Sequence, residues 1–212
     1  MPAKPPKMQS PASVRAETAA APQRIVAGAR RYFFAHGFRG VTMDDLAAEL
    51  GMSKKTLYAH FPSKMELLQA VILDKMSSVE AGLQRAMSES QGDFSARLEA
   101  MLFCVRSHTE EIGEPYLRDV RREAPELFAL IQQRRREYIL RYFGRLLQEG
   151  RKAGMIRSDI PATMMIEMLL GTVDAIVNPA KLGELGTTPK AAFHHIITIF
   201  LEGVLIRKGR AK

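Results

Sequence analysis

The feature that most constrains this 212-residue chain is a pair of short helical patterns joined by two residues. The first, over residues 42–50, begins at Thr42, a good N-cap residue that is followed three positions later by an acid, as in a capping box. Gly51 ends this pattern, and Ser53 is the N-cap of the second pattern, over residues 53–61. Two helices joined by so short a glycine-containing turn predict helix-turn-helix geometry.

A third helical pattern precedes this pair and completes a compact unit. It begins at Ser13 or at Pro22, which suits a first helical turn, and ends at His36, where Gly37 acts as a stop. Apolar side chains recur along it at four-residue spacing: Ile25, Ala29 and Phe33. Such spacing places them on one face, so we expect three helices packed around a shared apolar core.

The second helix of the pair has an unusually polar outer surface. Leu57 and Phe61 face inward at i and i+4, whereas Lys, Thr, Tyr and His side chains cover the rest of the helix. Residues 1–64 also carry ten Lys or Arg against four acids, so most of the net charge of +8 lies in the first third of the chain. A basic, polar surface of this kind can contact phosphates and base edges, which predicts DNA binding.

The rest of the chain also has helical spacing, and no segment shows sustained period-2 alternation. We therefore expect an all-α fold of about nine helices: an N-terminal three-helix helix-turn-helix domain and a C-terminal antiparallel helical bundle. The further helices are expected over 64–90, 94–108, 116–123, 125–152, 161–177 and 189–207, with a turn at Gly92-Asp93. The expected domains are a basic arm, disordered or a helix extension (1–21), a DNA-binding domain (22–68), and an effector-binding and dimerisation domain (69–212).

The N-terminal residues carry a resemblance to a known family. VTMDDLAAELGMSKKTLYAHFPSKMELL resembles the DNA-binding segment of the TetR (tetracycline-repressor-like) family of bacterial regulators, and RIVAGARRYFFAHGF is similar to the family's first helix. The match covers roughly residues 22–72. RDVRREAPELF and GTVDAIVNP are similar, less specifically, to C-terminal domains of many members.

The resemblance implies a function and a set of DNA contacts. A homodimer would bind a palindromic operator as a ligand-responsive regulator, by family habit a repressor, and a small apolar effector would release it. The implied DNA contacts are Thr42, Met43, Ser53, Lys54, Lys55, Thr56, Tyr58, His60 and Lys64. Among them Lys64 would meet a phosphate at a helix N-terminus, Met43 lacks the usual hydroxyl or charge, and His60 has the alternative of capping its own helix.

Two further surfaces follow from the same resemblance. The effector chamber would be lined by Met101, Phe103, Tyr116, Tyr138, Tyr142, Phe143, Met165 and Met168, for which ordinary core packing is the alternative. The dimer interface would use the last two helices, through Gly171, Ala175, Ala192, Ile196, Ile199, Phe200 and Gly203. The alternative within the same fold is an effector-independent DNA-binding protein, which a collapsed C-terminal interior would favour.

Other functions find no support in the residues. No acid stands three positions before any of the five histidines, as a di-iron site requires, and there is no zinc cluster, phosphate loop or nucleophile motif. We therefore expect no enzymatic activity, no metal and no cofactor. A single cysteine, Cys104, no secretory signal and no long apolar stretch favour a cytoplasmic protein without membrane contact. The roles of Cys104 and His194-His195 stay open, and Arg134–Arg136 is either a solvated face or a second nucleic-acid site.

Overall fold

The computed structural model describes residues 11–88 and 94–205, with the backbone alone for residues 11–20. Within these ranges the fold is helical, apart from one antiparallel bridge between Ile156 and Leu205. The elements are α1 (Pro11–His36), α2 (Met43–Glu49), α3 (Lys54–His60), α4 (Lys64–Ser88), α5 (Phe94–Glu110), α6 (Glu114–Glu123), α7 (Pro125–Tyr138), the π-helical turn η1 (Ile139–Phe143), α8 (Gly144–Lys152), α9 (Ala162–Ile176), α10 (Pro179–Glu184) and α11 (Pro189–Val204). None of these described helices is both long and apolar enough to cross a membrane.

The helix count and one helix start differ from expectation. Because α7, η1 and α8 run on without a break, the described residues form ten separate helices, and the additional one is α10. Its start is a local signal that was missed: the Asn178 side chain accepts a hydrogen bond from the backbone N–H of Lys181 at 3.0 Å, and Pro179 occupies the first turn. α1 begins at Pro11, so Pro22 lies inside a helix and not at its start.

The first domain boundary can be compared with the structure in part. Residues 1–10 of the expected basic arm lie outside the described residues, as does the turn expected at Gly92-Asp93. Residues 11–21 form the helix-extension alternative, since they continue α1. Their Ala-rich sequence has high helix propensity, which accounts for this outcome.

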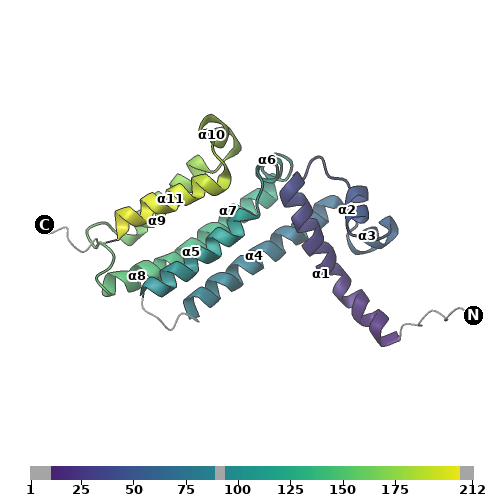
Figure 1. Cartoon of the computed structure of the whole chain (residues 1–212), viewed down its shortest axis with the longest axis horizontal. Coiled ribbons are helices and arrows are strands. Elements are labelled where there is room, and N and C mark those ends of the chain that lie inside the picture. The colour runs from purple at the N-terminus through teal and green to yellow at the C-terminus, as the bar shows by residue number, and fades with distance from the viewer. Residues whose placement is uncertain (1–10, 89–93, 206–212) are drawn as a thin grey trace, which may run out of the picture.

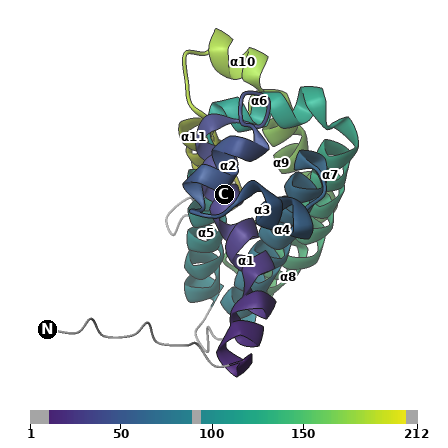
Figure 2. The same cartoon turned by 90° about the vertical axis from the view of Figure 1, so that its right-hand side faces the viewer.

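Two apolar cores divide the molecule along its length. The first core lies among helices α1, α2, α3 and α4. It holds fully buried side chains such as Phe33, Leu46, Leu57 and Leu68. It also includes Tyr116 and two further residues of the α6 segment, which extends this core beyond the three N-terminal helices. Figure 2 shows α2 and α3 at the end of the molecule, in front of the bundle.

The second core is formed by the far half of α4 with α5, η1, α8, α9 and α11. α4 has 25 residues, which corresponds to about 37 Å. Its buried residues near the start, such as Leu68, belong to the first core, whereas Leu83 belongs to the second. α4 therefore runs through both parts of the molecule and connects them (Figure 1).

Candidate functional site

The start of α2 is fixed by a reciprocal pair of hydrogen bonds between Thr42 and Asp45. The Asp45 backbone N–H donates to Thr42 Oγ1 at 3.1 Å, and the Thr42 backbone N–H donates to Asp45 Oδ2 at 2.8 Å. This capping box confirms the sequence prediction. Hydrogen bonds from Thr42 also lower the pKa of the Asp45 carboxyl. The arrangement sets the direction in which α2 leaves the preceding loop.

The turn between α2 and α3 depends on a left-handed glycine. Gly51 has a φ of +63°, a conformation that L-residues rarely adopt. The Met52 N–H donates to the Ala47 carbonyl at 3.0 Å, and the Gly51 N–H donates to the Ala48 carbonyl at 3.1 Å. These two bonds form a Schellman motif. The motif ends α2 sharply, and only Gly51 and Met52 separate its C-cap residue, Leu50, from the N-cap residue of α3, Ser53, as the sequence predicted.

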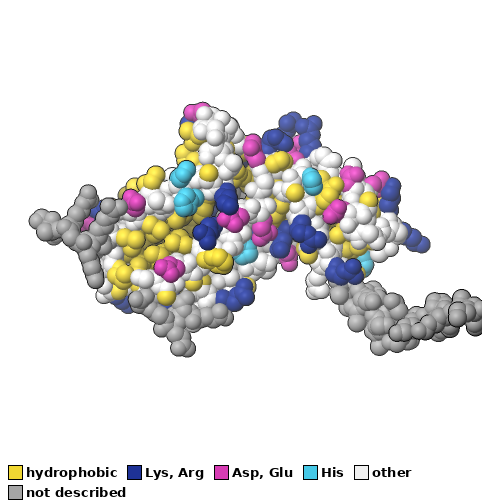
Figure 3. Space-filling view, in the orientation of Figure 1, with side chains coloured by type: hydrophobic (Ala, Val, Ile, Leu, Met, Phe, Trp, Pro, Cys, Tyr) yellow, Lys and Arg dark blue, Asp and Glu magenta, His cyan; other side chains and the backbone are white. Residues whose placement is uncertain are grey.

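α3 is anchored by one buried side chain, and most of its other side chains are exposed. Leu57 is fully buried, while Tyr58 remains 46% exposed. Ser53 caps the helix, because its Oγ accepts a hydrogen bond from the Thr56 backbone N–H at 3.1 Å. Exposed side chains on the α3 segment are Ser53, Lys54, Lys55, Thr56 and Tyr58, and His60 is half-buried. Figure 3 shows Lys and Arg side chains at this end of the molecule.

The two lysines of α3 differ in their surroundings. Lys54 Nζ lies 2.5 Å from Asp44 Oδ2 of α2, and both side chains are exposed. Among the described residues, Lys55 has no ion-pair partner, and its side chain is exposed. Lys55 is therefore the more available of the two for a phosphate or a base, and Lys54 would have to exchange Asp44 for DNA.

Two residues implied as DNA contacts have other surroundings. Met43 is only 6% exposed and belongs to the first core, so its side chain faces the protein interior. Lys64 Nζ donates to the carbonyl oxygens of Phe38 at 2.9 Å and Val41 at 2.8 Å, and lies 4.4 Å from the centre of the Phe38 ring. A further carbonyl, of Arg39, lies at 3.4 Å. Three acceptors match the three ammonium donors, so Lys64 holds the α1–α2 loop, and its contact with a phosphate stays a prediction.

A second contact holds the same loop and was not predicted from the sequence. Asp119 of α6 is 6% exposed, and its Oδ2 accepts a hydrogen bond from the Arg39 backbone N–H at 2.9 Å. Nearby, the Gly113 N–H donates to the Phe34 carbonyl of α1 at 3.1 Å. The partners are about 80 residues apart in sequence, so only the folded chain brings them together.

A turn of this geometry between two short helices with a polar outer face is a DNA-binding element. Residues 25–71 match the family described as bacterial regulatory proteins, tetR family. Residues 25–71 form a DNA-binding domain of the TetR family. The HTH-type transcriptional regulators among the relatives support DNA-binding regulation by this chain.

Relatives of this chain include several HTH-type transcriptional regulators. An uncharacterized regulator of Bacillus subtilis, YvaF, is 24% identical over 183 residues, which cover 86% of this chain and 94% of YvaF. YfiR of the same organism is 29% identical over 169 residues, covering 74% and 78%. SrpR of Pseudomonas putida is 35% identical over 85 residues, covering 40% of this chain and 39% of SrpR.

Solved structures of transcriptional regulators share the fold. A regulator from Agrobacterium tumefaciens is 18% identical and superposes with a TM-score of 0.68, covering 89% of this chain and all of the other. SmeT of Stenotrophomonas maltophilia, at 19% identity, gives a TM-score of 0.60 and covers 91% of this chain and 94% of SmeT. The likeness extends beyond the helix-turn-helix and includes the C-terminal bundle.

The bundle contains a cavity of about 240 Å³ that is partly open to solvent. Its walls come from α4, α5, α6, α7, η1, α9 and α11, and most are apolar, for example Met76, Val79, Phe193 and Ile197. The π-helical turn contributes Phe143 to the wall, and π-helical turns often occur at functional sites. The C-terminal interior is therefore not collapsed.

The structure does not place the eight predicted chamber residues together. Only Tyr138 and Phe143 line the cavity. Met101 and Tyr142 are buried in the core and do not line it, Tyr116 packs against Phe34 in the first core with the two rings tilted, and Phe103 is 63% exposed. Met165 and Met168 line a different groove. Residues two apart on a helix point about 200° apart, so Met101 and Phe103 could not share one chamber.

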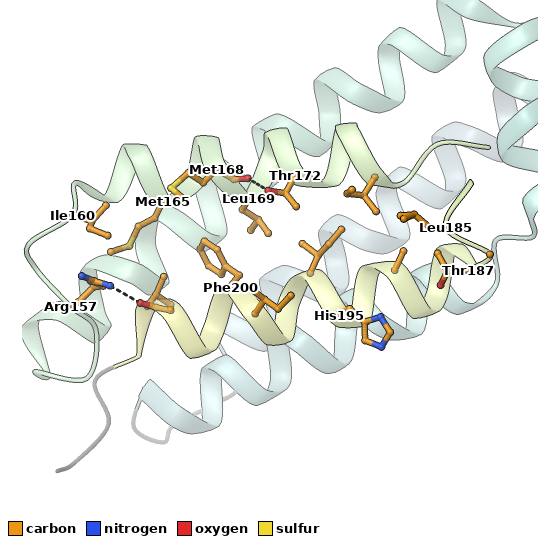
Figure 4. Close-up of a pocket in the computed structure, with 17 residues that line it drawn as sticks. Arg157, Ile160, Met165, Met168, Leu169, Thr172, Leu185, Thr187, His195 and Phe200 are labelled. Atoms are coloured by element: carbon orange, nitrogen blue, oxygen red, sulfur yellow. Dashed lines mark hydrogen bonds between the residues drawn. The ribbon is translucent and has the colours of Figure 1, made fainter. Parts of the chain in front are cut away.

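That other groove, of about 790 Å³, lies between α9 and α11 and is open to solvent. Figure 4 shows Met165, Leu169 and Thr172 of α9 facing Phe200 of α11 across it. Its lining includes five of the seven residues predicted for the dimer interface: Ala192, Ile196, Ile199, Phe200 and Gly203. The other two, Gly171 and Ala175, are exposed on α9 without lining the groove.

The residues whose roles were open have ordinary surroundings. Arg134, Arg135 and Arg136 form ion pairs with Glu137, Asp174 and Glu167, respectively, which supports a structural role for this run. Cys104 is buried, and burial raises the pKa of its thiol. His194 and His195 are exposed on α11, and His195 lines the α9–α11 groove. No group of three or more potential metal ligands occurs in the part of the chain that the structure describes.

Proposed function

We propose that this regulator is a ligand-responsive repressor that binds a palindromic operator as a homodimer and leaves it when a small, largely apolar effector binds. The observation that carries the proposal is the cavity of about 240 Å³ in the bundle, which α4 lines. The same helix begins beside the helix-turn-helix. A ligand in the cavity therefore contacts an element that belongs to both parts of the molecule.

The proposed division of labour follows the expected domains. Residues 22–68 would bind DNA through Thr42, Ser53, Lys54, Lys55, Thr56, Tyr58 and His60. Residues 69–212 would bind the effector and the second subunit. A smaller cavity of about 60 Å³ shares Lys75 and Met76 with the larger one and reaches Phe34 of α1, so residues that a ligand would contact also border the first core.

The effector acts in this proposal by shifting a conformational equilibrium. It can release DNA only if it binds the DNA-free conformation more tightly than the DNA-bound one, and the shift is limited by that difference in affinity. In a dimer, a small change in the direction of α4 changes the separation of the two α3 helices. The two helices would then no longer match the half-site spacing.

The α9–α11 groove supports a homodimer. Its exposed apolar side chains include Ile199, at 74% exposed, and Met168, at 58%. Contiguous apolar surface of this kind on a soluble protein marks an interaction site. One α3 helix contacts few base pairs, whereas a twofold pair can read two half-sites about one DNA turn apart or a multiple of it, roughly 34–36 Å per turn.

Repression is the proposed direction of regulation. SmeT is described as the repressor of a multidrug efflux pump, whereas FasR of Mycolicibacterium smegmatis, 33% identical over 93 residues, is an activator. Because the FasR match covers only 44% of this chain, it leaves more than half of the chain uncompared. Occupation of an operator that overlaps a promoter would by itself exclude the polymerase.

A footprint on the DNA upstream of the protein's own gene tests the proposal. We expect two protected half-sites related by a dyad and, by light scattering, a particle of twice the chain mass. Deleting the gene should raise transcription from the footprinted promoter. A single unpaired half-site, a monomer bound to DNA, or lower transcription in the deletion strain would each contradict the corresponding part of the proposal.

A further inference from the structure

The charged groups that line the bundle cavity all carry one sign. Twenty residues line it, and none is Asp or Glu, whereas Lys75 and Arg135 contribute two cations and His108 a titratable ring. The remaining wall is almost entirely apolar. Donors and cations on an apolar wall give a cavity an electrostatic preference, since an apolar wall weakens the screening of charges by water.

Lys75 is the more deeply buried of the two cations. Its side chain is 4% exposed, its Nζ donates to Glu111 Oε1 at 2.8 Å, and it lies 3.0 Å from His108 Nδ1. An ammonium has three donors, and these contacts use two of them. Burial lowers the pKa of Lys75 and of His108, and the Lys75 charge lowers that of His108 further.

Arg135 supplies a second donor that lacks an acceptor. Its terminal Nη2 donates to Asp174 of α9, but its Nε is buried and has no hydrogen-bond partner within the described structure. A buried donor without an acceptor is unfavourable. A ligand that carried an acceptor to this nitrogen would remove that penalty.

The acids that pair with these cations lie toward solvent. The side chains of Glu111 and Asp174 are 38% and 50% exposed, whereas Lys75 and Arg135 are 4% and 30% exposed. Neither acid lines the cavity. Water therefore screens the negative partners more than the positive groups, and the field inside the cavity stays positive.

From this arrangement we infer that the cavity selects lipophilic anions, molecules with a hydrocarbon body and one carboxylate, over lipophilic cations of the same length. The apolar wall takes the body. The carboxylate accepts charge-assisted hydrogen bonds from Arg135 Nε and Lys75 Nζ. The inference deepens the proposed function, since it names the class of effector for the same cavity.

Binding of an anion at Lys75 would also act on the helix-turn-helix. Glu111, which Lys75 holds, lies 3.7 Å from Arg30 Nε of α1, and Arg30 Nη1 lies 3.0 Å from Asp74 of α4. A carboxylate on Lys75 competes with Glu111 for the ammonium. It thereby loosens a set of ion pairs that joins α1, α4 and the end of α5.

Calorimetry with three probes of equal chain length tests the inference on the full-length protein: decanoate, 1-decanol and decylammonium. We expect decanoate to bind at least about tenfold more tightly than decylammonium, the effect of one charge-assisted hydrogen bond.

Arg135→Gln should lower decanoate affinity by about tenfold and leave 1-decanol affinity unchanged. Arg136→Gln is the matched control, because Arg136 pairs with Glu167 of α9 and does not line the cavity.

Lys75→Met tests the second cation, with thermal unfolding as a check that the variant folds. If it does not fold, the Arg135→Gln comparison alone decides. Decylammonium binding as tightly as decanoate, no decanoate binding below its micellar limit, or equal decanoate loss in Arg135→Gln and Arg136→Gln would each overturn the inference.

A DNA-release assay separates this inference from the proposed function. Decanoate that binds in the cavity while the protein stays on its operator contradicts the proposed release but upholds the anion preference. Release by decylammonium and not by decanoate upholds a ligand-responsive regulator and overturns the anion preference.

Discussion

The Asp119 carboxylate of α6 accepts a hydrogen bond from the backbone N–H of Arg39, with 2.9 Å between Oδ2 and N. The bond ties the bundle to the loop that positions α2. Gly37, in the same loop, has a φ of +84°, and a Cβ there would lie 2.6 Å from Asp119 Oδ2. The close approach of α6 therefore requires a glycine at this position, and the DNA-binding helices are held from the bundle side.

Replacing Asp119 should destabilise the protein through this loop. Asp119→Ala leaves the Arg39 N–H without its acceptor, and the expected loss is about 1–3 kcal/mol in the free energy of unfolding. Urea unfolding measures it. Glu123→Gln is the control, because Glu123 lies 4.0 Å from the largely exposed Arg39 guanidinium and such pairs contribute under about 1 kcal/mol. Equal losses in the two variants would show that the Asp119 bond has no special role.

Lys55 and Lys64 should differ in how their removal changes the salt dependence of DNA binding. If Lys55 neutralises a phosphate, Lys55→Ala lowers the slope of log K against log salt by about 0.9. Lys64→Met should leave the slope unchanged and lower stability, since the Lys64 ammonium donates to backbone carbonyls. Titrations of operator DNA at several salt concentrations measure both slopes. A lower slope for Lys64→Met and an unchanged one for Lys55→Ala would reverse the assignment.

The Thr42–Asp45 capping box should make stability depend on pH. The folded-state pKa of Asp45 lies below its ordinary value of 3.8. The contribution of the Asp45 carboxylate to the free energy of unfolding is therefore full above that pH and is lost as the pH falls through the lower folded pKa. At neutral pH, Thr42→Ala should cost about 1 kcal/mol.

Urea unfolding at neutral and acidic pH checks this prediction. The difference in the free energy of unfolding between wild type and Thr42→Ala should shrink on acidification. The difference for Ser53→Ala should stay constant, because that cap pairs with Thr56 and not with an acid. A Thr42→Ala difference that is independent of pH would contradict the account.

The α9–α11 groove should hold the proposed dimer together. Ile199→Asp places a charge on its most exposed apolar side chain and should shift the protein to monomer, because a buried unpaired charge is strongly unfavourable. Light scattering after size-exclusion chromatography measures the mass. Thr198→Asp, on the neighbouring exposed position outside this groove, should remain a dimer. If neither variant dissociates, the dimer interface lies elsewhere on the molecule.

Local sequence signals predicted the DNA-binding element well. Thr42 and Ser53 cap their helices, and Gly51 takes a left-handed conformation, because these features depend on a few neighbouring residues. The short helix α10 was missed although Asn178-Pro179 is a helix-start signal, because six residues are too few to show periodicity.

Long-range placement could not be read in the same way. Lys64 has the position of a phosphate contact in the family, but its neighbours 23 to 26 residues earlier decide that it donates to carbonyl groups. Phe103 and Tyr116, predicted for the effector chamber, do not line the larger cavity, since residue type does not reveal which side of a helix meets it. The wall depends on the rotation of six packed helices relative to one another.

The assignment of α3 as the DNA-reading helix is tested most directly by fluorescence anisotropy with operator DNA. We predict that Lys54→Ala and Tyr58→Ala each weaken binding by about tenfold, the effect of losing roughly 1.4 kcal/mol of contact energy. Met43→Leu should leave the affinity unchanged, because Met43 is buried. Wild-type affinity in both alanine variants would contradict the assignment of α3.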